Sequence, residues 1–176
     1  MLIKTVFAGF GGQGVLSMGL NLAQAAMIEG KNVTYLPSYG PEVRGGTANC
    51  TVAISDEEIA SPVASAPEFV VAMNQPSLDK FQNQIASGGL LFINSSLVET
   101  EILRGDIEVV EVAASSIAEK LGSPRSANMV MLGALIKKSN LVSISTLIEG
   151  LKDALKNKGK LIALNKKALM AGYDLF

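Results

Sequence analysis

Short apolar runs alternate along the chain with longer segments of mixed polarity. Residues 3–8 and 69–73 predict buried strands, and residues 32–36 and 90–93 predict two further strands; the segments 69–73 and 90–93 are uninterrupted apolar runs. Two further segments alternate between apolar and polar side chains. This alternation predicts half-buried strands at residues 47–54 and 107–112, the second of them at an edge of the sheet.

The segments that connect and follow these strands carry helical signals. Residues 15–29 have helical spacing, with Leu16, Leu20, Ala23 and Met27 on one side. More helices are predicted near residues 76–84, 116–121, 128–138, 144–155 and 160–171. The alternation of strands and helices predicts one domain, residues 1–176. Its fold class is α/β, three-layer and Rossmann-like: a mostly parallel sheet with helices on both faces, and the C-terminal helices packed on the sheet.

A glycine turn joins the first predicted strand to the first predicted helix. It has the sequence Gly9-Phe10-Gly11-Gly12-Gln13-Gly14, which matches the pattern G-x-G-x-x-G. Glycines permit a tight turn and let a phosphate approach the backbone, and the start of a helix offers free N–H groups to an anion. The candidate cofactor-binding residues are therefore Gly9, Gly11, Gly12, Gln13 and Gly14. The alternative is a glycine turn that only packs.

The end of the second predicted strand disfavours an ordinary dinucleotide dehydrogenase. Dinucleotide-binding folds usually place Asp or Glu there, to hold the ribose hydroxyls. This strand ends Tyr35-Leu36-Pro37-Ser38, and the next carboxylate is Glu42, inside the following loop.

That loop, residues 38–47, is the second candidate site. Glu42 and Arg44 are its two charges, and Arg44 is followed by Gly45 and Gly46. A guanidinium framed by glycine backbone suits recognition of phosphate or carboxylate, whereas a mutual Glu42–Arg44 surface pair is the alternative. The candidate binding residues of the loop are Ser38, Tyr39, Gly40, Glu42, Arg44, Gly45, Gly46 and Thr47. Asn74, which ends a strand at the same predicted rim, is a further candidate, with capping of the next helix as the alternative.

Composition excludes several kinds of chemistry. The chain has no histidine and a single cysteine, Cys50, on an apolar strand where it is expected in the core. A zinc site, an iron–sulfur cluster held by this chain alone and a His-activated nucleophile are therefore excluded. A free thiol also fits a reducing, cytoplasmic setting. Hydrophobic residues make up 48% and charged residues 18%, with a mean hydropathy of +0.34. Apolar surface of this kind needs cover, so a partner subunit is expected.

The charge of the chain does not favour nucleic acid or a membrane. The net charge is −1, so no global field attracts nucleic acid. Residues 137–176 nevertheless carry eight lysines against three acids. This basic segment is either a docking surface or a solvated helix face. Residues 5–28 are uncharged but rich in glycine and amide side chains, which predicts a strand, turn and helix rather than a membrane span.

The glycine turn and the loop together resemble a known family. Gly9–Gly14 followed by Ser-Tyr-Gly-Pro-Glu-Val-Arg-Gly-Gly-Thr-Ala-Asn-Cys at residues 38–50 is similar to the gamma subunit of 2-oxoacid:ferredoxin oxidoreductases. The later segments 72–77 and 128–133 extend the resemblance over essentially the whole chain. The resemblance marks the glycine turn and residues 40–47 as signature positions.

The resemblance implies a subunit of an enzyme that converts a 2-oxoacid, coenzyme A and oxidised ferredoxin to acyl-CoA, CO2 and reduced ferredoxin. Thiamine diphosphate, Mg2+ and the 4Fe-4S clusters would be held by the alpha, beta and delta subunits, and ferredoxin would bind through the complex. This chain would hold no cofactor alone, and it would have no catalytic residue or metal site of its own. It would contribute to assembly and to the region that receives coenzyme A. The resemblance favours 2-oxoglutarate or a branched-chain 2-oxoacid over pyruvate as substrate.

Three other interpretations stay open. One is a free-standing Rossmann-type nucleotide-binding protein or small dehydrogenase, which the missing carboxylate after the second strand disfavours. Another is the beta subunit of indolepyruvate oxidoreductase, because similar modules occur in that enzyme. The last is an assembly subunit with no ligand contact. A homodimer of the isolated chain is also left open.

Overall fold

We describe a computed structural model, which covers residues 1–39, 47–99, 102, 104–156 and 158–176. Its strands are β1 (Leu2–Phe10), β2 (Asn32–Tyr39), β3 (Thr47–Ser55), β4 (Phe69–Ala72), β5 (Leu90–Asn94) and β6 (Glu108–Val112). Its α-helices are α1 (Val15–Ile28), α2 (Gln75–Phe81), α3 (Ala114–Lys120), α4 (Ala127–Ser139), α5 (Ile144–Ala154) and α6 (Gly159–Tyr173). Two short 3-10 helices are η1 (Gln82–Gln84) and η2 (Pro124–Ser126).

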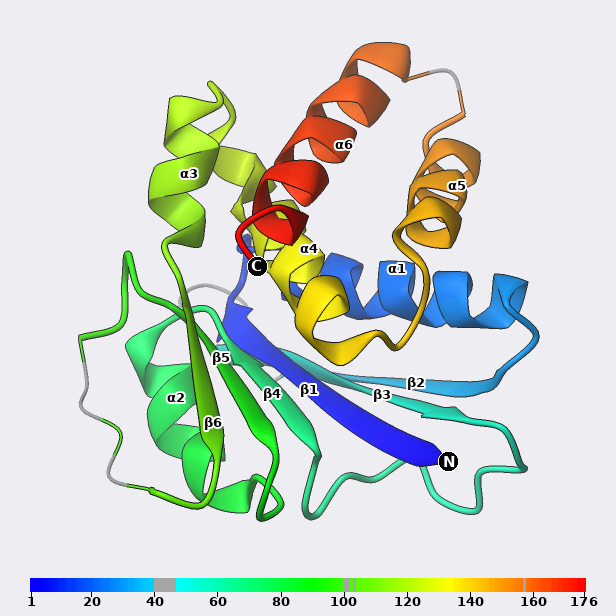
Figure 1. The fold of residues 1–176 in the computed structure, drawn as a ribbon, viewed down its shortest axis with the longest axis vertical. Coiled ribbons are helices and arrows are strands. Elements are labelled where there is room, and N and C mark those ends of the chain that lie inside the picture. Colours follow the sequence, from blue (N-terminus) through cyan, green and yellow to red (C-terminus); the bar gives the residue numbers. More distant parts are fainter. Residues whose placement is uncertain (40–46, 100–101, 103, 157) are drawn as a thin grey trace.

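The strands form one six-stranded sheet in the order β2-β3-β1-β4-β5-β6 (Figure 1). β1, β4, β5 and β6 are parallel, and β6 lies at an edge, as its alternating sequence predicts. β3 is antiparallel to both of its neighbours, β1 and β2. The connection through α1 therefore joins two parallel strands that are not adjacent, because β3 occupies the place between them. The prediction of a mostly parallel sheet is confirmed.

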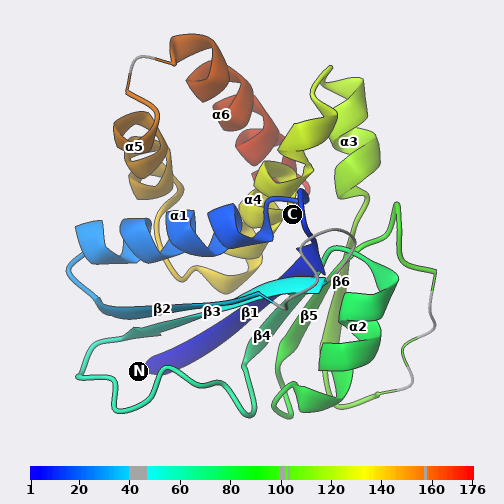
Figure 2. The ribbon, with the colours of Figure 1, turned by 180° about the vertical axis from the view of Figure 1, so that it is seen from behind.

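Helices cover both faces of the sheet, which confirms the three-layer prediction. α2 packs on one face, where Leu78 and Phe81 contact the apolar side chains of β1, β4 and β5. α1, α3 and α4 lie on the other face, with α5 and α6 beyond them (Figures 1 and 2). The two apolar clusters on either side of the sheet form the core of the domain.

The C-terminal helices form a double layer. All side chains from Asn128 to Ile136 of α4 are buried, because α4 is covered by the sheet on one side and by α6 on the other. Gly172 of α6 lies so close to α4 that an added Cβ would stand 1.8 Å from the carbonyl oxygen of Val130. α4 therefore packs on the sheet as predicted, whereas α6 packs mainly on α4.

The predicted side of α1 is only partly the side that faces the core, because Ala23 is buried and Leu16 is partly buried against it. The buried side carries Val15, Met18, Gly19 and Leu22, whereas Leu20 is 45% exposed and Met27 is 64% exposed. The helix is apolar or small around most of its circumference, so the spacing of Leu16, Leu20, Ala23 and Met27 does not select the buried face.

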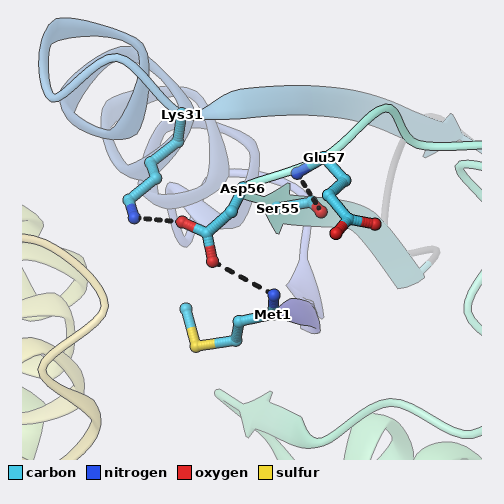
Figure 3. A network of polar contacts seen from close by, with 5 residues as sticks. All are labelled: Met1, Lys31, Ser55, Asp56 and Glu57. Atoms are coloured by element: carbon cyan, nitrogen blue, oxygen red, sulfur yellow. Dashed lines mark hydrogen bonds and ion pairs between the residues drawn. The ribbon is translucent and has the colours of Figure 1, made fainter.

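Ion pairs hold the end of the sheet at which β1 begins (Figure 3). The Asp56 carboxylate, just after β3, accepts a hydrogen bond from the Lys31 ammonium, just before β2. It also accepts from the amino group of Met1, at 3.1 Å. The amide N–H of Glu57 donates to Ser55 Oγ at 3.0 Å. These contacts bring the starts of β1 and β2 and the end of β3 together at the end of β1 opposite the glycine turn.

Candidate functional site

The glycine turn needs glycine at two of its positions. Gly12 has φ +94° and Gly14 has φ +73°, both in the left-handed region that side chains disfavour. Gly14 is also the N-cap of α1 and supplies no side chain to cap the helix. The first N–H groups of α1 therefore lack a side-chain cap at the carboxyl end of β1.

The side chain of Gln13 clamps the turn from inside. Its Oε1 accepts hydrogen bonds from the amide N–H of Phe10 at 2.7 Å and from Asn74 Nδ2 at 2.9 Å. Its Nε2 donates to the carbonyl oxygen of Met73 at 3.2 Å. Gly9 makes room for this side chain, because an added Cβ there would lie 2.7 Å from Gln13 Oε1. Gln13, a predicted binding residue, thus uses its amide to join the ends of β1 and β4.

Two buried asparagines fix the neighbouring strand ends. Asn74 Oδ1 accepts from the amide N–H of Ser77 at 3.0 Å and caps α2, the alternative role that the sequence left open for it. Asn94, at the end of β5, donates from Nδ2 to Ser115 Oγ at 2.9 Å and accepts at Oδ1 from the Ser115 amide at 3.3 Å. Each asparagine satisfies backbone or side-chain groups of the next helix, so the rim is held by buried polar contacts.

Asn128, at the start of α4, contacts the glycine turn across the domain. Its Nδ2 donates to the carbonyl oxygen of Gly14 at 3.3 Å, and its Oδ1 accepts from the amide N–H of Met129 at 2.9 Å. A Cβ at Gly14 would stand 2.4 Å from Asn128 Nδ2. Gly14 is thus required for its conformation and for the space that Asn128 occupies.

The described ends of the second candidate loop lie beside the glycine turn. Thr47 opens β3 in register with Phe10, and Ser38 near the end of β2 is in register with Asn49. The strands on both sides of the loop therefore reach the end of the sheet at which β1 stops and the glycine turn lies. The predicted residues Gly40, Glu42, Arg44, Gly45 and Gly46 lie outside the described residues. The side chain of Tyr39 does as well.

A pocket of about 210 Å³ opens beside the glycine turn. It is lined by Gly12, Gln13, Met73, Ser115, Pro124, Arg125 and Ala127. Arg125 is the one charged residue in this lining, and its side chain is exposed. Sequence reasoning did not single out Arg125. The available signal was a lone cation in the segment Ser123-Pro124-Arg125-Ser126, directly before an apolar helix that follows at the same rim.

The chemistry of the described residues is that of binding. Within the described ranges, no group of three or more Cys, Asp or Glu side chains could hold a metal ion. Cys50 is fully buried and contacts the carbonyl oxygen of Val15 at 3.5 Å, and burial raises the pKa of its thiol to about 12. The prediction that Cys50 is a core residue is confirmed. None of the helices that the structure describes combines the length and the apolar character that crossing a bilayer requires.

The fold and the rim define an α/β module built around a glycine turn, with an arginine pocket at the carboxyl ends of its strands. A family model described as pyruvate ferredoxin/flavodoxin oxidoreductase matches residues 4–175. The chain belongs to this family.

Two relatives show how the module is used in longer and shorter chains. The ketoisovalerate oxidoreductase subunit VorA of Methanothermobacter thermautotrophicus is 43% identical over 173 residues, covering 98% of this chain and 36% of the relative. The 2-oxoglutarate synthase subunit KorC of Methanocaldococcus jannaschii is 36% identical over 171 residues, covering 96% of this chain and 90% of the relative. The chain thus spans about a third of VorA and nearly all of KorC.

Solved structures agree with this picture. The gamma subunit of a keto/oxoacid ferredoxin oxidoreductase from Geobacter sulfurreducens has a TM-score of 0.84 and 29% identity, with 98% of this chain and 96% of that chain covered. The 2-oxoglutarate:ferredoxin oxidoreductase of Magnetococcus marinus, with 2-oxoglutarate, coenzyme A and succinyl-CoA bound, has a TM-score of 0.92 and 28% identity. The match covers 99% of this chain and 31% of that chain.

Proposed function

We propose that this chain is the gamma subunit of a multi-subunit 2-oxoacid:ferredoxin oxidoreductase. The complex would convert a 2-oxoacid, coenzyme A and oxidised ferredoxin to acyl-CoA, CO2 and reduced ferredoxin. The observation that carries the proposal is the near full-length match, in both directions, to KorC and to the gamma subunit from G. sulfurreducens. Relatives named for 2-oxoglutarate and ketoisovalerate support 2-oxoglutarate or a branched-chain 2-oxoacid as the substrate.

The residues of this chain do not fit the redox cofactors of such a complex. One cysteine is present, and Cys50 is buried with its thiol protonated. A cluster needs several thiolates, so this chain cannot hold an iron–sulfur cluster alone. The clusters in the beta and delta subunits, and the thiamine diphosphate between the alpha and beta subunits, are what the family resemblance implies. In this proposal the chain helps to bind and orient the anionic co-substrate at the subunit junction, and it contributes no electron-transfer step.

The rim of the sheet is the part of the chain that suits an anionic co-substrate. Gly12 and Gln13 of the turn that precedes the uncapped start of α1 line the 210 Å³ pocket together with Ser115 and the exposed Arg125. Arg44, which the sequence singles out, belongs to the loop whose flanking strands end at this rim. We assign Arg44 to a phosphate or carboxylate at the subunit junction, with Gly45 and Gly46 giving that group access to the backbone.

Reconstitution tests the function. The alpha, beta and delta subunits are co-expressed with or without this chain, and reduction of ferredoxin is followed with 2-oxoglutarate, 2-oxoisovalerate or pyruvate in the presence of coenzyme A. We expect reduction that depends on the 2-oxoacid, on coenzyme A and on this chain. Full activity in the absence of the chain contradicts the proposal. A large thermal shift of the isolated chain with NAD or NADP, and none with coenzyme A, would favour the free-standing nucleotide-binding protein instead.

Arg44→Ala tests the binding role within that complex. We expect a higher KM for coenzyme A, weaker assembly or both. Arg44→Lys should retain part of the wild-type binding, because it keeps the charge but loses the bidentate geometry. If neither KM nor assembly changes, the assignment of Arg44 is wrong. Loss of assembly with an unchanged KM in the remaining complex would identify a purely structural subunit.

A further inference from the structure

A second hollow, of about 500 Å³, opens between α1, α5 and α6. α5 packs mainly on α1, whereas α6 packs mainly on α4, so the two helices stand apart above the sheet (Figures 1 and 2). The space between them forms the hollow, which we call the leucine groove. Its apolar lining consists of Leu20, Met129, Leu151, Leu155, Leu161 and Leu164, together with Ala154.

The leucine groove contains a cation and no anion. Arg125 is the single charged residue among the described residues that line it. No hydrogen bond or ion pair to the Arg125 side chain is found within the described ranges. Beyond Leu161 and Leu164 the groove continues into an open hollow lined by Lys158 and Lys160. The rest of the wall is polar and uncharged, formed by Ser17, Asn21, Gln24, Ser123, Ser126, Asn128 and Asn165. An occupant that matches this lining has apolar side chains toward the leucines and carboxylates toward Arg125 and toward Lys158 and Lys160.

Acidic groups nearby lie outside the groove. Asp153 of α5 lines an adjoining, smaller hollow, which shares Gln24 and Ala154 with the groove and is also lined by Met27 and Ile28 of α1. Glu149 is exposed on α5 and does not line the groove. The positive character of the groove is therefore not cancelled by a carboxylate in its wall.

Apolar surface continues past the mouth of the groove. Leu20 is 45% exposed, Leu161 is 40% exposed, and Met27 and Ile28 are 64% and 49% exposed. Contiguous exposed apolar side chains of this size are typical of surfaces that bind another protein. Two relatives carry this module as 36% and 31% of a longer chain, so in them further protein is joined to the same fold.

We propose that the leucine groove receives an apolar segment with acidic residues at its ends, supplied by a partner subunit of the oxidoreductase. The inference rests on the proposed function, because the partner is another subunit of the same complex. Leu20, Leu161 and Leu164 bury the apolar side of the segment. Arg125 and the pair Lys158 and Lys160 bind its carboxylates, at opposite ends.

Substitutions in the groove test the proposal without threatening the fold. Leu20→Asp and Leu161→Asp change partly exposed side chains, and each puts a carboxylate where an apolar, acidic segment would lie. We expect each variant to weaken association with the co-expressed subunits at least about tenfold, measured by titration of the purified chain. Leu97→Asp is the matched control, because Leu97 is 49% exposed and lies in the turn after β5, next to Val98 of the α2-side cluster. It should assemble like the wild type.

A photo-cross-linking amino acid at position 161 identifies the occupant in the assembled complex. The expected product joins this position to one segment of a partner subunit that is rich in apolar residues and contains Asp or Glu. Reversing those acids to lysine should weaken assembly, and Arg125→Glu should restore part of the binding. Arg125 also lines the pocket beside the glycine turn, so the leucine variants, rather than Arg125 alone, decide the result.

The outcomes separate this inference from the proposed function. If the wild-type chain neither assembles nor supports ferredoxin reduction, the proposed function fails. If it does both, and Leu20→Asp and Leu161→Asp assemble with unchanged affinity, the groove inference alone is wrong. If the cross-linker at position 161 attaches to no partner segment in the assembled complex, whether or not coenzyme A is present, the groove inference is also wrong.

Discussion

The side-chain amide of Asn128 donates a hydrogen bond to the backbone carbonyl of Gly14 at 3.3 Å, although the two residues are 114 positions apart. This contact joins the start of α4 to the glycine turn at the start of α1. The turn is thus held from three directions: by Asn128, by Asn74 through Gln13, and by its own strand. Several expectations for variants follow from how tightly these groups are packed.

Gly14→Ala should destabilise the protein by about 2 kcal/mol or more, because it adds a strained φ and places a Cβ 2.4 Å from Asn128 Nδ2. The cost should be smaller when Asn128→Ala is also present, since the two shortest contacts, to Nδ2 and Cγ, are then removed and the one to Cβ at 3.2 Å remains. Urea unfolding of the two single variants and the double variant measures this coupling. Gly12→Ala is the control: it has a positive φ but nothing within 4 Å of the added atom, so its cost should not depend on residue 128.

Gln13→Ala should loosen the turn, because three hydrogen bonds to the Gln13 amide are lost. We expect a destabilisation of about 2 kcal/mol and faster hydrogen exchange at the amide of Phe10. Gln84→Ala removes an exposed side-chain bond to the carbonyl of Lys80 and should leave exchange at Phe10 unchanged. Equal protection of the Phe10 amide in wild type and Gln13→Ala would show that the clamp does not restrain the turn.

The Asp56 carboxylate should make the stability of the folded protein depend on pH in the acidic range. The hydrogen bond from Lys31, followed by that from the Met1 amino group, lowers the pKa of the Asp56 carboxyl below its ordinary value of 3.8. A carboxyl whose pKa is lower in the folded state contributes stability above the unfolded pKa, and this contribution is lost as the pH falls through the folded pKa. Asp56→Asn should therefore lower Tm near pH 6 and show a smaller further loss between about pH 4 and about pH 2. Glu58→Gln, at an exposed carboxyl with no ion pair among the described residues, is the control.

The Cys50 thiol should resist modification in the folded protein. Burial raises its pKa to about 12, so the reactive thiolate is scarce at neutral pH, and the side chain is 0% exposed. We expect slow labelling by iodoacetamide near pH 8 that becomes fast in denaturing urea. Rapid labelling under native conditions, with no change in the far-ultraviolet circular dichroism, would contradict the buried position of Cys50.

Much of the fold follows from local patterns. β4 and the first four residues of β5 are uninterrupted apolar runs because helices cover both faces of the sheet there, and β6 alternates at the edge of the sheet. The predicted helix near residues 144–155 is α5, and Ser143 caps it, with Oγ accepting from the amide N–H of Thr146. The antiparallel insertion of β3 could not be predicted in this way, because alternation shows which face of a strand is buried and does not identify the strand it pairs with.

The sequence predicts where on the sheet the candidate site lies, but it predicts less well which residues make contacts there. The glycine turn and the strand ends mark the rim, and the register of Phe10 with Thr47 brings the second loop to it. The contacts of Gln13 and Asn128 could not be predicted, because an amide can cap a helix, bridge two segments or bind a ligand with equal chemistry. Arg125 was not singled out for a different reason: it lines two hollows, and their existence depends on how α4, α5 and α6 pack.

The position of β3 has a consequence for biosynthesis. β1 leaves the ribosome before the other strands of this module, yet both of its neighbours, β3 and β4, come later in the sequence, and β2 does not pair with it. Until residue 72 has been made, the buried strand that becomes the middle of the sheet has at least one unpaired edge. Nascent chains of this module are therefore exposed to edge-to-edge association during that interval.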